Sequence, residues 1–224
     1  MIIVSGAGRS GTNMMLEILR GHPLLIASMP EEDKKLFEQF YFAYPPQHLC
    51  KCDSAYIKSF NEEVVRLLEC CAHARIIWMV RDLRDMAISR IYHGYKRGAD
   101  DATFEGCVAD LYKSTDLAKR LFKYAPQKAY LQKMEDILLD TEGSIRKVCK
   151  FLRLDFREDM IKFYTRMRNP EYEHYKEGID KTRVNLYKNW KTLYDGFFVS
   201  SDFDIDMEKL FEFLNPLNEY FGYE

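Results

Sequence analysis

The chain lacks a long apolar run and an excess of charge of either sign. No segment approaches the roughly 20 consecutive apolar residues that a membrane-spanning helix needs, so we expect no membrane association. The 33 Lys and Arg residues nearly balance the 35 Asp and Glu residues, which gives a net charge of −2. No overall field therefore attracts nucleic acid, and any anion site must be built locally.

A standard pattern of metal-binding cysteines is also missing. Cys50 and Cys52 are separated by one residue, and Cys70 and Cys71 are adjacent, neither of which is a zinc spacing. We therefore expect all six cysteines to be reduced thiols, and no metal site. The first residues resemble a buried strand rather than a signal peptide, which predicts a cytoplasmic protein.

Strand and helix patterns alternate along the 224 residues, without repeats or a linker-like stretch. Apolar runs predict strands at 2–5, 75–80 and 129–134, and helical periodicity predicts helices after 13, at 60–71, after 82, at roughly 104–124 and from 141. This order predicts a single domain, 1–224, with an α/β fold around a mainly parallel sheet flanked by helices. In such sheets, ligands bind beyond the carboxyl ends of the strands.

The first such end carries a glycine-rich loop, Gly6–Asn13, that opens a helix. Glycines let backbone N–H groups approach a phosphate, and hydroxyl and amide side chains add donors. Arg9 supplies a cation that can make two parallel bonds to an oxyanion. A nucleotide-hydrolase loop would carry lysine where Thr12 stands, so we predict a phosphate site of another kind. The alternative is a glycine turn that serves packing only.

The second such end reads Arg81-Asp82-Leu83-Arg84-Asp85-Met86-Ala87-Ile88-Ser89. A guanidinium at the strand end and a hydroxyl in the following helix can together hold a second oxyanion. The alternative interpretation is a solvated cluster of surface ion pairs, which would contribute little to stability.

These two segments carry a family resemblance. Gly8–Asn13, G-R-S-G-T-N, resembles the 5′-phosphosulfate loop P-[KR]-S-G-T-T of sulfotransferases that use 3′-phosphoadenosine 5′-phosphosulfate (PAPS). Segment 81–89 resembles their 3′-phosphate motif R-[DN]-P-R-D-x-A-x-S, with leucine in place of proline. Segments 134–136 and 183–191 resemble the family's Y-E-D and R-K-G-x-x-G-D-W-K segments, in the same order along the chain.

The resemblance implies a P-loop-type, three-layer fold and transfer of a sulfuryl group from PAPS, without a metal. The product of the donor would be 3′,5′-adenosine bisphosphate (PAP). The 5′-phosphosulfate would be held by Arg9, Ser10, Gly11, Thr12 and Asn13, and the 3′-phosphate by Arg81, Ser89 and Arg183. Trp190 would pack close to the nucleotide. Met14 and Met134 replace aromatic residues that some members have, so the adenine contacts are not predicted.

The same resemblance suggests roles in the reaction. Arg9 would stabilise the leaving phosphate. The segment after the first helix, with His22-Pro23 and Met29-Pro30, is more similar to carbohydrate, tyrosine and bacterial members than to cytosolic small-molecule ones. Those members place a glutamate base here, so Glu31 or Glu32 is the first candidate for the base, then Asp53, with Lys51 assisting. The alternative for 31–35 is a solvated charge run; full activity in Glu31→Gln, Glu32→Gln and Asp53→Asn would exclude all three bases.

The acceptor is expected to bear a hydroxyl or amine, on a carbohydrate, peptide or small molecule. Its site walls would be segments 24–60 and 155–182, which the motifs leave free and which are rich in aromatic residues. Core packing explains most such aromatics. Two alternatives remain: a P-loop kinase that uses ATP, and a non-catalytic protein that binds PAPS or PAP. The sequence does not give the oligomeric state.

Overall fold

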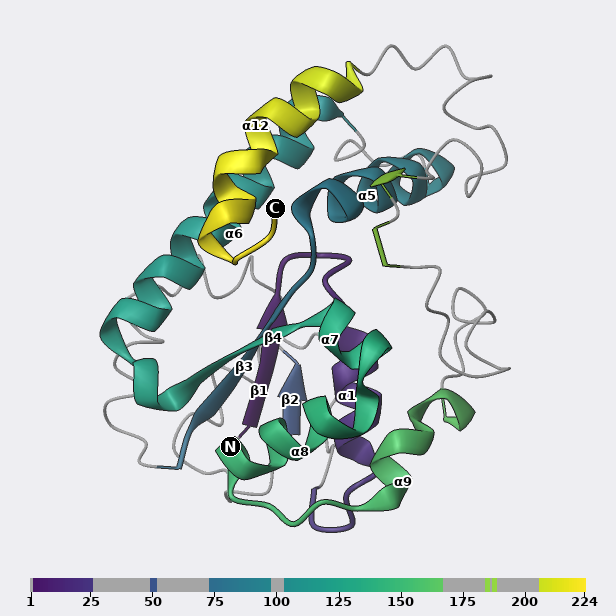
Figure 1. The fold of residues 1–224 in the computed structure, drawn as a ribbon, viewed down its shortest axis with the longest axis vertical. Coiled ribbons are helices and arrows are strands. Elements are labelled where there is room, and N and C mark those ends of the chain that lie inside the picture. Colours follow the sequence, from purple (N-terminus) through teal and green to yellow (C-terminus); the bar gives the residue numbers. More distant parts are fainter. Residues whose placement is uncertain are drawn as a thin grey trace.

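In the part of the chain that the structure describes, four parallel strands form the sheet at the centre of the fold (Figure 1). The computed structural model describes residues 2–25, 49–51, 73–97, 103–166, 184–185, 187–188 and 206–224, without the side chains of a few of them. The strands are β1 (Ile2–Gly6), β2 (Leu49–Lys51), β3 (Arg75–Val80) and β4 (Ala129–Lys133), in the order β2-β1-β3-β4. Apolar, largely β-branched side chains in β1 and β3 suit these two buried central strands.

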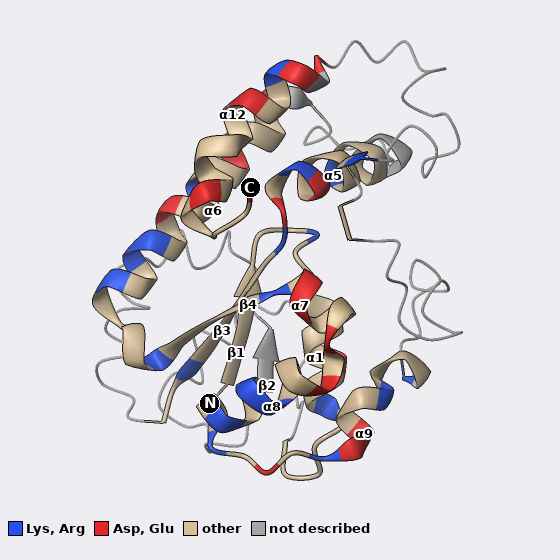
Figure 2. Ribbon diagram, viewed as in Figure 1, with Lys and Arg blue, Asp and Glu red and all other residues tan. Residues whose placement is uncertain are grey.

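The strand register brings three carboxyl ends to one edge of the sheet. Gly6 of β1 lies beside Met79 of β3, and Met79 lies beside Gln132 of β4. The segments that follow β1, β3 and β4 therefore leave the sheet at the same edge. Figure 2 shows Lys, Arg, Asp and Glu residues gathered where these strands end. The two segments singled out in the sequence are both at this edge.

One face of the sheet is covered by α5 (Leu83–Arg97), α6 (Phe104–Tyr124) and α12 (Met207–Tyr220). Ile3, Ile76, Trp78 and Val80 point to this face and are at most 3% exposed. They pack against leucine and alanine side chains of α6 and α12. The alternation of side chains along each strand then directs the intervening residues to the opposite face.

The opposite face is covered by α1 (Thr12–Arg20), α7 (Met134–Leu139), α8 (Thr141–Leu152), α9 (Glu158–Ile161) and the 3-10 turn η3 (Lys162–Thr165). Val4, Ile77 and Met79 contribute the strand side of this second core. A further 3-10 turn, η2 (Pro126–Lys128), leads into β4. Helix, sheet and helix thus form three layers (Figure 1), which confirms the α/β architecture.

The predicted elements agree with the structure where it describes them, apart from shifted boundaries and several elements that were not predicted. The strand predicted at 2–5 extends to Gly6, and the strand Arg75–Val80 and the helix Phe104–Tyr124 are confirmed. The strand predicted at 129–134 ends at Lys133, because Met134 already begins α7, which the sequence analysis did not predict. The short strand β2 and the helices α9 and α12 were also not predicted. The predicted helix at 60–71 lies outside the described residues.

Residues 158–166 pack at the C-terminal end of α1. The Arg166 guanidinium donates to the carbonyl oxygen of Glu17 at 2.9 Å and to that of Asp159 at 2.8 Å. Phe163 is fully buried in the second core, so this aromatic residue serves packing. The described part of the proposed acceptor wall 155–182 therefore lies at the opposite end of α1 from Gly6–Asn13. Residues 167–182 and 26–48 lie outside the described part of the chain.

Among the residues that the structure describes, no helix combines the length and apolar character of a membrane span.

Candidate functional site

The loop between β1 and α1 has an unusual backbone at three positions. Gly6 has φ 154°, Gly11 has φ 94°, and Arg9 has φ 73° although it is not a glycine. A Cβ on Gly6 would lie 2.4 Å from the carbonyl oxygen of Met79 and 2.6 Å from Ser10 Oγ. Only glycine allows the loop to fold this closely against the end of β3. The left-handed conformation of Arg9 costs about 1–2 kcal/mol, so the surrounding contacts must hold it in place.

The loop presents donors at the start of α1. Gly11 is the N-cap residue, and no described side chain caps the helix there. The turn is closed by the Ser10 N–H, which donates to the Ala7 carbonyl at 3.2 Å. Ser10 Oγ is buried and has no hydrogen-bond partner within the described residues. A buried hydroxyl without a partner is costly, and together with the uncapped helix start it fits an anion that would accept from both.

The second segment is buried rather than solvated. Arg81, Asp82, Asp85 and Ser89 are 5%, 3%, 0% and 3% exposed. Arg81 Nη2, just before α5, lies 3.3 Å from Asp85 Oδ2 in the first turn of that helix, and the two form an ion pair. The interpretation of this segment as a solvated surface cluster is therefore wrong.

A hydrogen bond joins the two segments. Arg9 Nε donates to Ser89 Oγ at 3.1 Å, across 80 residues of sequence. A serine hydroxyl that accepts this bond keeps its own O–H for donation to another acceptor. The cation of the first loop and the hydroxyl of the second segment thus belong to one site.

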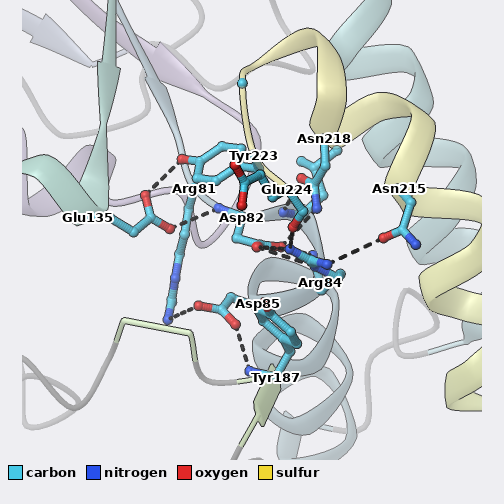
Figure 3. Close-up of polar contacts among 12 residues, drawn as sticks. Arg81, Asp82, Arg84, Asp85, Glu135, Tyr187, Asn215, Asn218, Tyr223 and Glu224 are labelled. Atoms are coloured by element: carbon cyan, nitrogen blue, oxygen red, sulfur yellow. Dashed lines mark hydrogen bonds and ion pairs between the residues drawn. The ribbon is translucent and has the colours of Figure 1, made fainter.

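The segment that resembles the family's C-terminal motif reaches the same site. The Tyr187 N–H donates to Asp85 Oδ1 at 2.7 Å, while Asp85 Oδ2 pairs with Arg81 (Figure 3). The Arg84 guanidinium lies over the Tyr187 ring, 4.0 Å from its centre. The hydrogen-bonded carboxylate of Asp82 raises the pKa of Arg84. Tyr187, which lies between Arg183 and Trp190 in sequence, therefore contacts the second segment.

The segment at the start of α7 lies between the two others. Met134 Sδ would be 3.2 Å from a Cβ placed on Gly11, so Met134 packs against the first loop. Glu135 Oε1 accepts from the Asp82 N–H at 2.9 Å and so contacts the second segment. Three of the four segments that resemble family motifs are thus in contact through described atoms. Tyr187, which belongs to the fourth of these segments, contacts the second.

Other predicted site residues are outside the described part of the structure. Glu31, Glu32, Asp53, Arg183 and Trp190 are all in this group. The backbone of Lys51 ends β2 and pairs in register with Val4, two residues before Gly6, but its side chain is not described. Their roles remain predictions. Within the described residues, no group of three or more His, Cys, Asp or Glu side chains could hold a metal ion.

The sequence analysis missed the contribution of the C-terminal residues to this edge. Asn218 and Tyr223 donate to Asp82 and Glu135 at 2.9 and 2.7 Å (Figure 3). Neither residue is part of a motif. The only related signal in the sequence was the resemblance of segment 134–136, which contains Glu135, to the family's Y-E-D segment. Their partners are 136 and 88 residues away, so no local pattern reveals the contacts.

The glycine-rich loop and the buried residues Arg81 and Ser89 thus lie together at the carboxyl edge of the sheet. A family model described as "Sulfotransferase domain" matches residues 1–177 of the 224. The chain belongs to the sulfotransferase family, whose members are PAPS-dependent transferases. A search of curated proteins gave no match.

Solved structures support the fold. The sulfotransferase domain of the Synechococcus PCC 7002 olefin synthase has a TM-score of 0.65 and 16% identity, over 100% of this chain and 94% of that one. A sulfotransferase domain from the curacin biosynthetic pathway has a TM-score of 0.66 and 14% identity, over 100% and 98%. Retinol dehydratase, in complex with androsterone and the inactive cofactor PAP, has a TM-score of 0.58 and 15% identity, over 100% and 82%. These likenesses confirm the P-loop-type fold expected from the sequence.

Proposed function

We propose that this protein transfers a sulfuryl group from PAPS to a hydroxyl or amine of a carbohydrate, peptide or small-molecule acceptor. Family membership supports the reaction class. Retinol dehydratase, which shares the fold, was solved with PAP and androsterone and with PAP and retinol, which supports PAPS as the donor and a hydroxyl as the acceptor group.

The observation that carries the proposal is the hydrogen bond between Arg9 and Ser89. PAPS carries phosphate at two separate positions of one nucleotide, and this bond joins the two segments that we propose to bind them. A triphosphate would instead need all its donors on one loop, including the lysine that Thr12 replaces. The buried Ser10 hydroxyl and the uncapped start of α1 suit the 5′-phosphosulfate. Arg81 and Ser89 suit the 3′-phosphate.

The reaction follows from the donor and these residues. An acceptor oxygen or nitrogen attacks sulfur in line, the bond from sulfur to the bridging oxygen breaks, and PAP leaves with the electron pair. Arg9 and the N–H groups of Gly11 and Thr12 would stabilise the negative charge on that leaving oxygen. The acceptor proton goes to a base, for which Glu31, Glu32 and Asp53 are the candidates. Such catalysis rests on positioning and electrostatic stabilisation.

Thermal unfolding tests the donor assignment without an acceptor. PAP at about 100 times its Kd is expected to raise Tm by about 5 °C or more, because it binds only the folded protein. ATP with Mg²⁺ at the same concentration is expected to leave Tm nearly unchanged. Stabilisation by ATP and Mg²⁺ alone would contradict the proposal and favour a kinase. Labelled PAPS with a panel of acceptors then separates an enzyme from a protein that only binds PAP.

A further inference from the structure

Three successive backbone N–H groups after Arg81 are already bonded within the protein. The N–H of Asp82 donates to Glu135 Oε1, that of Leu83 to Asn218 Oδ1, and that of Arg84 to Asp82 Oδ1, all at 2.9 Å. Phosphates at helix N-termini are normally held by such N–H groups. Because these three are committed, recognition of an anion at this turn depends on the side chains that the turn carries, and so on how firmly the turn holds them.

Two of these three acceptors come from distant parts of the chain. Glu135 lies in the first turn of α7, and Asn218 lies in α12, a helix outside residues 1–177, the range that the family model matches. Asn218 makes a second bond to the turn, because its Nδ2 donates to Asp82 Oδ1 at 2.9 Å. Asn218 is 1% exposed, so its amide is committed to these contacts.

Tyr223 holds the side chain of Glu135, the other hydrogen-bond acceptor from a distant part of the chain. Its hydroxyl donates to Glu135 Oε2 at 2.7 Å, while Glu135 Oε1 accepts from the turn, so both carboxylate oxygens are held (Figure 3). Burial, followed by the charge of Glu135, raises the pKa of Tyr223, which keeps the hydroxyl protonated as a donor. Lys133 anchors the same segment, since its Nζ donates to the Gly222 carbonyl at 2.8 Å and lies 4.2 Å from the centre of the Tyr223 ring.

We propose that Asn218 and Tyr223 are positioning residues for recognition of the donor's 3′-phosphate. They hold the 81–84 turn through Asp82 and Glu135, and thereby set the positions from which Arg81 and Ser89 act on that phosphate. The inference rests on the proposed function. It assigns the C-terminal residues 218–224 a part in donor selectivity.

Comparison of PAP with adenosine 5′-monophosphate (AMP), which lacks the 3′-phosphate, tests this. Isothermal titration on the full chain gives the ratio of the AMP Kd to the PAP Kd. Tyr223→Phe removes one hydrogen bond and is expected to weaken PAP binding about fivefold. Asn218→Ala removes two contacts and is expected to weaken it about tenfold or more. AMP binding should change less than about twofold in both, because only the 3′-phosphate depends on the turn.

Tyr220→Phe is the matched control. Tyr220 is 43% exposed at the end of α12, the helix that carries Asn218, and its ring contacts Phe221 and Lys119. Its substitution should leave both Kd values unchanged. Equal loss of AMP and PAP affinity in Tyr223→Phe, or no loss, would overturn the inference while the proposed function stands. If Asn218→Ala does not fold, the near-isosteric Tyr223→Phe decides alone. If the unaltered protein does not prefer PAP over AMP, the proposed function and this inference both fail.

Discussion

Replacement of Arg9 by alanine is expected to lower turnover by about 10²–10³-fold, the usual loss when a preorganised donor to a leaving oxyanion is removed. Arg9 lies on the loop proposed to hold the 5′-phosphosulfate, and its Nε bonds to Ser89. PAP affinity should fall much less, because the N–H groups of the loop and the second segment remain. The measurement is the rate of sulfuryl transfer from PAPS to the best acceptor of a panel, at saturating donor.

Arg9→Lys is the informative comparison for this variant. The family's loop accepts either lysine or arginine here, so the lysine variant should retain most of the turnover that alanine loses. Both substitutions keep a non-glycine residue at φ 73°, so they share the backbone cost of that position. Turnover of Arg9→Ala within about threefold of the parent would mean that Arg9 does not act at the reacting bond.

Replacement of Arg81 by alanine is expected to affect donor binding most. Arg81 is 5% exposed and pairs with the fully buried Asp85. The change removes the cation proposed for the 3′-phosphate, and a charge-assisted hydrogen bond of this kind contributes about 1.5–3 kcal/mol, or roughly 10–150-fold in affinity. Titration with PAP measures this loss. Stability should also fall, by up to about 3–5 kcal/mol, because Asp85 loses a buried partner.

Arg90→Ala separates the loss of PAP affinity from the loss of stability. Arg90 follows Ser89 on α5 and pairs with Asp110 of α6 at 2.6 Å. Removal of the Arg90 side chain breaks an ion pair between α5 and α6, on the side of α5 that faces α6. Arg90→Ala should therefore lower Tm without changing PAP affinity. If Arg81→Ala keeps the affinity of the parent at a temperature where it is folded, the second phosphate assignment is wrong.

The sequence allowed prediction of the elements with strong local signals. The apolar runs of β1 and β3 and the long periodic pattern of α6 have lengths and boundaries that agree with the structure. The two segments proposed to bind phosphate were singled out because glycine, hydroxyl and arginine residues follow these strands directly. Parallel strands bring such segments to one edge, which explains why Arg9 and Ser89 can meet, although their hydrogen bond was not predicted.

The missed features depend on contacts far apart in sequence. Helix α7 has six residues, too few for a periodic pattern, and it is held in the protein by Ile137 and Leu138 in the second core. Asn218 and Tyr223 are ordinary polar and aromatic residues of a C-terminal helix and the turn after it. Only the folded chain shows that they bond to Asp82 and Glu135. The burial of Arg81 and Asp82 was likewise not evident from a charged stretch of sequence.

A crystal structure of the protein with PAP would show directly where the two phosphates lie. We expect the 5′-phosphate at the N–H groups that open α1, beside Ser10, and the 3′-phosphate in contact with Arg81 and Ser89. A 3′-phosphate that contacts neither side chain, or both phosphates on the Gly6–Asn13 loop, would contradict this expectation.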